Sequence, residues 1–407
     1  MREQGKLGWF KHDITHRGIT AWLLFAILLL FYFILYFPDK IGEGAQVFGA
    51  SKETVNWARE LGGSLNIFED FMRWLGAALG FTVKKWWDPV WNKWTLYGTL
   101  YTGGIVGGGI YMIRKYSHNR YQIIRMIAIM VTQTIFAFSL PIMLGATGHK
   151  DYYFSYFWPL KIEYLYPENL ANMPLFMVLY GVFGGLLLVP ILGAFFGKRW
   201  YCAWICGCGG LANTFGEPWR QLSNKSQAAW TFEKYSIHTM LVIALATTGI
   251  AAASFALGDK SPGLQQTATI VKYLYGVFGV ALLSGAVGVA FYPIGGTRVW
   301  CRFFCPMAAL LGLVQKFGRY RITVKRNMCI SCGMCSKYCE MGIDVRAYAQ
   351  RNQSFVRASC VGCGLCAEVC PRGVLRLENK ADPDPQELTM NKLLTQGYKE
   401  EPQRKAV

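Results

Sequence analysis

The chain has 407 residues, of which 53% are hydrophobic and only 16% are charged. This composition exceeds what a soluble core needs, so it favours a membrane protein over a soluble or disordered one. The formal net charge of +18 would suggest nucleic-acid binding in a soluble protein, but membrane proteins concentrate lysine and arginine in cytoplasmic loops. We therefore expect the lipid bilayer as a partner and no nucleic acid.

Six segments are apolar over enough residues to cross a bilayer, which takes about 20 helical residues. We predict membrane helices over residues 19–37, 95–113, 121–145, 175–197, 237–257 and 270–294. The first is interpreted as a retained anchor, because it is longer than the apolar core of a signal peptide and no small-residue cleavage site follows. The second has five glycines between residues 103 and 109, and small residues let membrane helices approach closely.

Between the first two helices, residues 51–79 carry apolar side chains at helical spacing, which predicts an amphipathic surface segment. Four tryptophans between residues 86 and 94 then fit an aromatic belt. His149 lies beside Asp151 and is either a proton acceptor for a quinol or a solvated histidine in an interfacial loop. Arg125, near an end of the third helix, is expected to extend its charge to the membrane surface.

Lysine and arginine set the orientation. Arg114, Lys115 and Arg120 lie between the second and third helices, and a further basic loop separates the fourth from the fifth. The positive-inside rule places these loops and both termini in the cytoplasm. We therefore expect a multi-pass protein of the inner (cytoplasmic) membrane of a bacterium.

The membrane part contains an internal repeat. The sequence from Tyr180 to Gly184 recurs from Tyr275 to Gly279. Each copy ends in an arginine and a pair of cysteines: Arg199, Cys202 and Cys206 in the first, and Arg298, Cys301 and Cys305 in the second. Because both preceding helices run toward the cytoplasm, we predict parallel repeats related by an axis along the membrane normal.

The two cysteines of each pair are four residues apart, so on a helix they share one face. With the repeat, four sulfurs would converge on a third metal centre, whether an iron–sulfur cluster, copper(I) or zinc. The alternative is that these are ordinary buried cysteines, which pack as small apolar side chains. Cys208 has no counterpart in the second copy, and is either a substitute ligand or without a role.

Two cysteine runs follow the membrane part. They read Cys329-x2-Cys332-x2-Cys335-x3-Cys339 and Cys360-x2-Cys363-x2-Cys366-x3-Cys370-Pro371. This is the bacterial ferredoxin spacing, in which the fourth cysteine of each run binds the other cluster. We therefore assign one [4Fe–4S] cluster to Cys329, Cys332, Cys335 and Cys370, and another to Cys360, Cys363, Cys366 and Cys339.

Paired zinc sites are the alternative to these clusters, but two complete runs fit iron–sulfur ligation better than paired zinc knuckles. Glu340 stands where a proline would follow the first run. An acidic side chain beside the crossing ligand is expected to lower the potential of that cluster slightly.

A Cys-x3-Cys-Pro element at the end of a membrane helix, followed by a two-cluster ferredoxin module, resembles the membrane polyferredoxins of the NapH/NosR/CcoG type over roughly residues 170–376. The first pair departs from the family pattern, since Gly207 follows Cys206. The resemblance implies electron transfer between the quinol pool, or a periplasmic or membrane-bound partner, and cytoplasmic clusters. The copper-reducing, oxidase-assembly branch of the family implies a different function.

We expect a mainly α fold: a six-helix transmembrane bundle with a parallel internal repeat and a C-terminal two-cluster ferredoxin-like α+β domain. The expected regions are an N-terminal membrane region (1–170), the repeat region (171–318), the ferredoxin domain (319–376) and a polar tail (377–407). The predicted function is an electron-transfer subunit of a respiratory-type complex, and the alternative is a copper-reducing or assembly factor for a respiratory oxidase. The expected cofactors are two [4Fe–4S] clusters, with a third metal centre and a quinone as further candidates.

Overall fold

The computed structural model describes residues 13, 16–36, 93–147, 152–197, 199–258 and 261–379. Four predictions fall wholly or largely outside these residues: the amphipathic segment 51–79, the aromatic belt at Trp86, Trp87 and Trp91, the pair His149 and Asp151, and almost all of the tail from residue 377.

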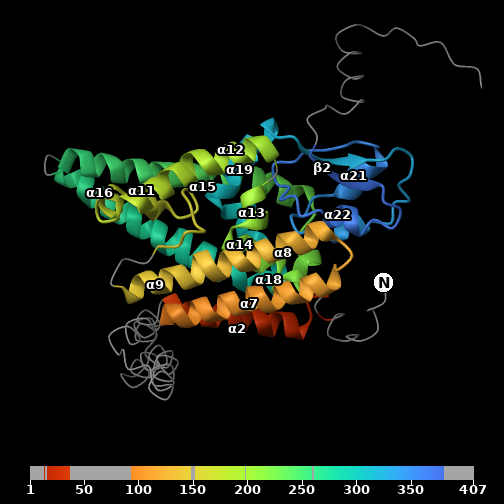
Figure 1. Cartoon of the computed structure of the whole chain (residues 1–407), viewed down its shortest axis with the longest axis horizontal. Helices are drawn as coiled ribbons and strands as arrows, with labels where there is room; N and C mark the ends of the chain where they lie inside the picture. Colours follow the sequence, from red (N-terminus) through yellow and green to blue (C-terminus); the bar gives the residue numbers. More distant parts are fainter. Residues whose placement is uncertain are drawn as a thin grey trace, which may run out of the picture.

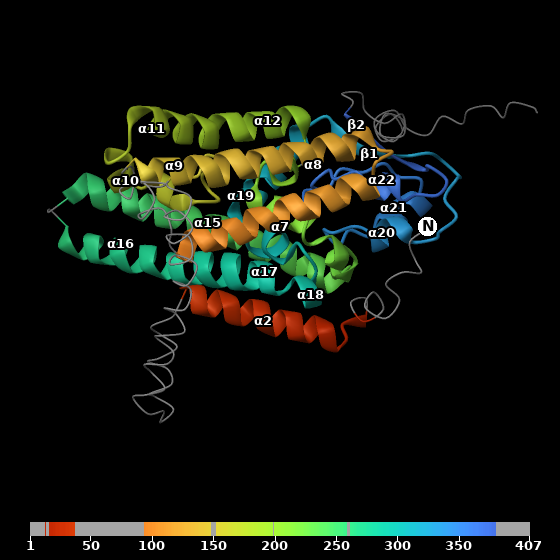
Figure 2. The ribbon, with the colours of Figure 1, turned by 60° about the horizontal axis from the view of Figure 1, so that its bottom comes forward.

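The described chain forms a long helical bundle with a small module at one end (Figure 1). The helices lie side by side along the length of the bundle, as the rotated view in Figure 2 also shows. They are α2 (Ile19–Tyr36), α7 (Lys93–Lys115), α8 (Arg120–Thr132) continued by η2 (Gln133–Ser139) and α9 (Leu140–Ala146), α11 (Leu175–Val182) continued by η4 (Phe183–Leu188) and α12 (Val189–Phe196), α15 (Gln227–Leu257), and α16 (Pro262–Leu274) continued by η7 (Tyr275–Val287) and α17 (Gly288–Ala290).

Within the described residues, five helical segments are long and apolar enough to cross a membrane. Each of the five overlaps a predicted membrane helix. The remaining predicted segment forms α7, but this glycine-rich helix is not among the five. The structure therefore has several apolar helices, and a bundle of six membrane helices stays a prediction.

Two helices begin earlier than predicted. α15 begins at Gln227 instead of residue 237, where the side chain of Ser226 accepts a hydrogen bond from the backbone N–H of Ala229. Its first turns carry Glu233 and Lys234. Hydropathy marks only the apolar part of a helix, so the polar turns before it were missed. α16 likewise begins at Pro262 and not at residue 270.

The two copies of the sequence repeat have similar local structure. α11 leads into the π-helical stretch η4 at Phe183, and α16 leads into the π-helical stretch η7 at Tyr275. Each ends in short helices that carry its cysteine pair. In the first copy these are α13 (Trp200–Trp204) and α14 (Gly207–Asn213), and in the second they are α18 (Tyr292–Gly295), η8 (Trp300–Phe304) and α19 (Pro306–Val314).

The short helices lie at the end of the bundle next to the C-terminal module (Figure 1). Two further short helical segments are η5 (Glu217–Leu222), which follows α14, and η9 (Gln315–Phe317), which follows α19 and precedes β1. At the opposite end lie η3 (Ile162–Leu165) and α10 (Pro167–Ala171).

The module is a small α+β unit, as expected for the ferredoxin domain. β1 (Tyr320–Val324) pairs antiparallel with β2 (Leu375–Asn379), so that Ile322 lies opposite Leu377. Between the strands lie α20 (Met334–Lys337), α21 (Val345–Gln350) and α22 (Leu365–Glu368). One apolar core runs through the four paired membrane cysteines and the module, which joins the two parts.

Candidate iron–sulfur centres

The module contains two small cavities, and each is lined by four cysteines. The first is lined by Cys329, Cys332, Cys335 and Cys370. The second is lined by Cys339, Cys360, Cys363 and Cys366. In both, three cysteines come from one run and the fourth from the other, as the ferredoxin spacing predicts. The structure thus brings together the two sets of ligands assigned from the sequence.

The residues present fit iron–sulfur clusters. All eight cysteines are free of disulfides. Gly333 and Gly364 have φ of 76° and 75° and directly precede α20 and α22, a left-handed geometry that glycine adopts without strain. Two complete four-cysteine runs whose fourth ligands cross between the sites fit iron–sulfur clusters better than zinc.

Burial favours the neutral thiol in the absence of a positive centre. It raises the pKa of Cys339 to about 12 and that of Cys335 to about 11. A metal centre bound to these sulfurs would supply the charge that favours the thiolate.

The four paired membrane cysteines lie together at the junction with the module. Cys202, Cys206, Cys301 and Cys305 are all buried in the shared core. Every pair among the four thiols is close enough to interact electrostatically. The structure therefore brings both Cys-x3-Cys elements to one place, as the repeat predicts. A metal centre there stays a prediction.

Close packing of α14 holds the first pair in place. A Cβ atom on Gly209 would overlap the carbonyl oxygen of Cys202. The thiol of Cys208 is hydrogen-bonded to that of Cys206, which lowers the pKa of Cys206 against the opposing effect of burial. Cys208 therefore lies next to the four paired membrane cysteines, although it has no counterpart in the second copy of the repeat.

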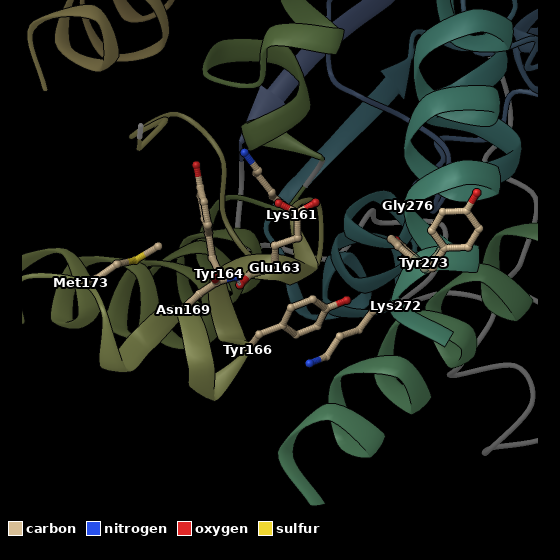
Figure 3. Close-up of a pocket in the computed structure, with 10 residues that line it drawn as sticks. Lys161, Glu163, Tyr164, Tyr166, Asn169, Met173, Lys272, Tyr273 and Gly276 are labelled. Carbon is tan, nitrogen blue, oxygen red and sulfur yellow. Dashed lines mark hydrogen bonds between the residues drawn. The ribbon is translucent and has the colours of Figure 1, made fainter. Parts of the chain in front are cut away.

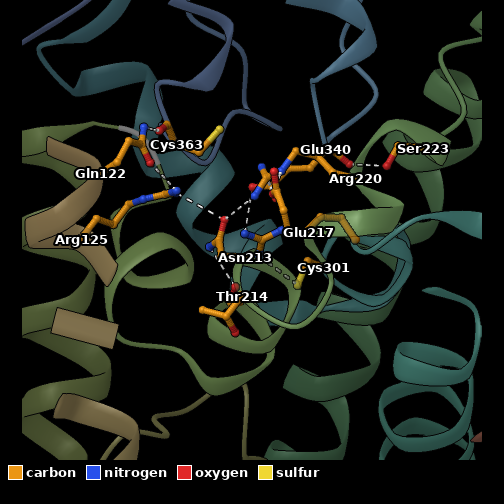
Figure 4. Close-up of polar contacts among 12 residues, drawn as sticks. Gln122, Arg125, Asn213, Thr214, Glu217, Arg220, Ser223, Cys301, Glu340 and Cys363 are labelled. Carbon is orange, nitrogen blue, oxygen red and sulfur yellow. Dashed lines mark hydrogen bonds and ion pairs between the residues drawn. The ribbon is translucent and has the colours of Figure 1, made fainter. Parts of the chain in front are cut away.

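A network of buried charges lies between the cysteine group and the module (Figure 4). Glu340 is paired with Nη1 of Arg220 at 2.8 Å and with Nη2 of Arg298 at 2.9 Å. Arg220 is also paired with Glu217 at 2.5 Å. Two arginines thus compensate the charge of Glu340. The expected effect of Glu340 on the potential of the neighbouring cluster stays a prediction.

Arg125 does not reach the membrane surface, so the prediction that it extends its charge there is wrong. Its guanidinium is fully buried and donates to Oε1 of Gln122 at 2.8 Å and to Oδ1 of Asn213 at 3.3 Å. Gln122 in turn donates to the carbonyl oxygen of Cys363 at 2.6 Å. Arg125 thus supports the contact between α8 and the module.

A large cavity extends from the cysteine group into the helical bundle. Its volume is about 520 Å³, and its wall includes Cys208 and Cys301 at one end and Glu163 of η3 at the other. Thr297 and Trp300 also line this pocket, and the hydroxyl of Thr297 and the indole Nε1 of Trp300 are buried without a hydrogen-bond partner among the described residues. Buried polar groups are rarely left unpaired, so each of these two donors needs an acceptor such as a bound water or a ligand.

A second pocket, of about 390 Å³, is shown in Figure 3 and shares part of its wall with the far end of this cavity. Lys161, Glu163 and Tyr275 line both spaces. Across the outer pocket, Lys272 is paired with Glu168 at 2.9 Å. Glu163 thus stands between the cavity in the bundle and the outer surface.

Several of these residues carried no signal in the sequence. Thr297, Trp300 and Glu163 belong to no motif, and only the cavity identifies them. Arg199 and Arg298 could have been singled out, because each precedes its cysteine pair by three residues.

Comparisons with known families agree with the placement of the cysteines. The 4Fe-4S dicluster domain matches residues 322–377. The 4Fe-4S binding domain matches twice, at residues 173–225 and 275–325. These two segments contain the two cysteine pairs of the repeat.

The chain is also similar to named proteins. It is 28% identical to the electron transport protein YccM of Escherichia coli (strain K12) over 39% of this chain and 46% of that protein. It is 26% identical to the uncharacterized protein MJ0749 of Methanocaldococcus jannaschii over 39% of this chain and 58% of that protein. It is 26% identical to the regulatory protein NosR of Stutzerimonas stutzeri over 36% of this chain and 20% of that protein.

The chain thus spans less than two thirds of the length of each of these relatives. No solved structure matches it. With the dicluster domain, the doubled 4Fe-4S binding domain and its apolar helices, the chain is similar to [4Fe–4S] membrane proteins of the polyferredoxin type.

Proposed function

We propose that this protein transfers electrons between a quinone dissolved in the membrane and [4Fe–4S] clusters on the cytoplasmic side, as a subunit of a larger membrane complex. The clusters would be held by the eight ferredoxin cysteines, and a third centre by Cys202, Cys206, Cys301 and Cys305. Clusters bound at these residues would take up and release single electrons. One of the similar proteins is named for electron transport.

The observation that carries this proposal is the pair of unpaired donors beside the cysteine end of the bundle cavity. Thr297 and Trp300 precede Cys301 in the same short segment, and all three line the cavity. A quinone has two ring oxygens that accept hydrogen bonds and an apolar tail. The hydroxyl and the indole N–H supply the donors, and the surrounding aromatic and aliphatic side chains suit the ring and tail.

Proton movement must accompany this reaction, because oxidation of a quinol to a quinone releases two electrons and two protons. Glu163 lines both the cavity and the outer pocket. Its carboxylate can therefore accept a proton from the cavity side and release it to water on the outer side. The electrons leave in the opposite direction, toward the cysteine end.

The distribution of basic residues supports a cytoplasmic module. Arg17 donates to the carbonyl oxygens of Ile294 and Leu222, and Lys115 is paired with Glu217 at 2.8 Å. His118 and Asn119, in the basic loop that follows α7, contact Glu368 of the module. The basic loops and the module thus occupy one end of the bundle, which the positive-inside rule assigns to the cytoplasm.

The alternative is a copper-reducing or assembly factor that would use the same membrane cysteines Cys202, Cys206, Cys301 and Cys305. Metal analysis of the purified full-length protein tests this point. We expect iron and acid-labile sulfide at about eight or more per chain, whereas stoichiometric copper would favour the alternative.

Quinone binding is tested with a photoreactive quinone and the protein in lipid nanodiscs. We expect labelling of residues that line the bundle cavity. The double variant Thr297→Val and Trp300→Phe removes both donors; valine has the shape of threonine, and phenylalanine keeps an aromatic ring at residue 300. Each hydrogen bond is worth about 1 kcal/mol, so we expect roughly tenfold to thirtyfold weaker binding.

Trp230→Phe is the matched control, because Trp230 is partly exposed on α15 and does not line this cavity. We expect it to bind the quinone as the unchanged protein does. Labelling confined to other parts of the chain, or equal affinity in the double variant and the unchanged protein, would contradict the proposed site.

A further inference from the structure

Two arginines occupy equivalent positions in the two copies of the repeat. Arg199 precedes Cys202 by three residues, and Arg298 precedes Cys301 by three residues. Both side chains are almost completely buried, with 2% and 1% exposure. A buried guanidinium must be compensated by nearby acceptors, so the partners of these two residues show what they connect.

Arg298 connects the membrane cysteines to the second cavity of the module. Its Nη1 lies 3.7 Å from Sγ of Cys301, and its Nη2 lies 2.9 Å from Oε1 of Glu340. Glu340 follows Cys339 directly and lines the cavity formed by Cys339, Cys360, Cys363 and Cys366. One guanidinium thus contacts a sulfur of the membrane group and the residue next to a ligand of the module.

Arg199 makes an equivalent connection through backbone groups. Its Nη1 donates to the carbonyl oxygen of Cys301 at 3.0 Å, and its Nε donates to the carbonyl oxygen of Ala358 at 2.7 Å. Its backbone N–H donates to the carbonyl oxygen of Cys360 at 3.3 Å. Cys360 lines the same cavity that Arg298 reaches through Glu340.

The other cavity has no such connection to the arginines. In the described part of the chain, neither Arg199 nor Arg298 is hydrogen-bonded to Cys329, Cys332, Cys335 or Cys370. Cys332 is exposed, and Arg346 and Arg372 form part of that cavity's wall. The two ferredoxin sites are therefore not equivalent in their relation to the membrane group.

We propose that Arg199 and Arg298 are positioning residues that connect the membrane cysteine group to only one of the two ferredoxin sites, that of Cys339, Cys360, Cys363 and Cys366. This inference rests on the proposed third centre. The connected site is the inner one, and the site of Cys329, Cys332, Cys335 and Cys370 is the outer one. Arg298 also stabilises negative charge on the sulfur of Cys301, which favours the reduced form of a centre bound there.

The first test is a redox titration of the full-length protein followed by electron paramagnetic resonance. Arg298→Gln removes the positive charge next to Cys301 and keeps a polar side chain of similar shape. We expect the reduction equilibrium of the membrane centre to become at least tenfold less favourable, which is about 59 mV for one electron. Arg298→Lys retains the charge and is expected to restore most of this loss.

Arg302→Gln is the matched control. Arg302 is 3% exposed and is paired with Glu233 at 2.7 Å, so its replacement also breaks a buried ion pair. We expect a similar loss of stability without the shift in potential. Equal shifts in Arg298→Gln and Arg302→Gln, or no shift in either, would overturn the role of Arg298.

The second test identifies the inner site. Cys332→Ser should disable the outer site, and Cys363→Ser the inner one. We expect magnetic coupling between the membrane centre and the remaining ferredoxin cluster in Cys332→Ser, and its loss in Cys363→Ser. Coupling that survives only in Cys363→Ser would reverse the assignment.

The tests also separate this inference from the proposed function. A third resonance signal that is present but unaffected by Arg298→Gln refutes only the role of the arginine. A protein with iron for two clusters and no third signal refutes the third centre and this inference together, while quinone binding in the bundle cavity is decided by the photolabelling experiment.

Discussion

Replacing Glu340 with glutamine should loosen the attachment of the ferredoxin module to the membrane part. The side chain of Glu340 is buried, and it forms the ion pairs with Arg220 at 2.8 Å and Arg298 at 2.9 Å. Glutamine keeps the shape of the side chain but leaves Arg298 without a carboxylate partner. Arg220 retains Glu217.

The expected cost follows from burial. Breaking a buried ion pair by removing one partner costs about 3–5 kcal/mol, because an uncompensated charge stays inside the protein. The bond from the Ser223 hydroxyl to the backbone carbonyl of Glu340, at 2.5 Å, is unaffected. A loss of this size should make separation of module and bundle roughly 10²- to 5 × 10³-fold more frequent.

Hydrogen exchange measures this separation at the backbone N–H of Arg199, which donates to the carbonyl oxygen of Cys360 across the junction. Iron content is determined first, so that only samples with full clusters are compared. Glu368→Gln is the control, because Glu368 also joins the module to the membrane part but its partner His118 is 67% exposed, so solvent weakens this pair. Equal exchange in both variants would refute the argument that the buried pair holds the module.

Three further predictions follow from the geometry. Cys339→Ser should remove the cluster held by the other cysteine run, with about four irons lost and the spectrum of the nearer run retained; loss of the nearer cluster alone would reverse the crossed assignment. Gly209→Ala should displace α14 from Cys202 and abolish the third centre. Gly103→Ala should retain that centre, because a Cβ atom at residue 103 meets nothing within 4 Å. Iron analysis and resonance spectra of the two variants test this difference. Burial acts to raise the pKa of Glu217, but nearby positive charges hold this pKa below its ordinary value. The stability that Glu217 contributes is therefore complete above about pH 4.3 and is lost as the pH falls toward the lower pKa of the folded protein. Hydrogen exchange near η5 should show this pH dependence, and Glu217→Gln should remove it.

The sequence by itself predicted the features that depend on local spacing. Three ligands of each ferredoxin site lie within seven residues of one another, so a single short cysteine run identifies most of the ligands of that site. The two sets of four cysteines found around the two cavities agree with that spacing. Most membrane helices were also predictable, because an apolar run long enough to cross a bilayer is rare in other kinds of structure.

The limits of hydropathy have a physical reason. α15 continues for ten residues before the predicted start at residue 237, where its side chains are polar. A hydropathy pattern reports the surroundings of a segment and not its backbone conformation, so helical turns outside the apolar layer are not detected.

Only the tertiary structure decided how the two redox parts are joined. Glu340 lies 42 residues from Arg298 and 120 from Arg220 along the chain. No sequence pattern relates positions so far apart, and a single arginine or glutamate on its own is more often a surface residue. The fold brings these charges into one buried place, where each must be compensated because the surroundings cannot solvate it. The same holds for Thr297 and Trp300, whose unpaired donors are recognised only once the cavity around them is known.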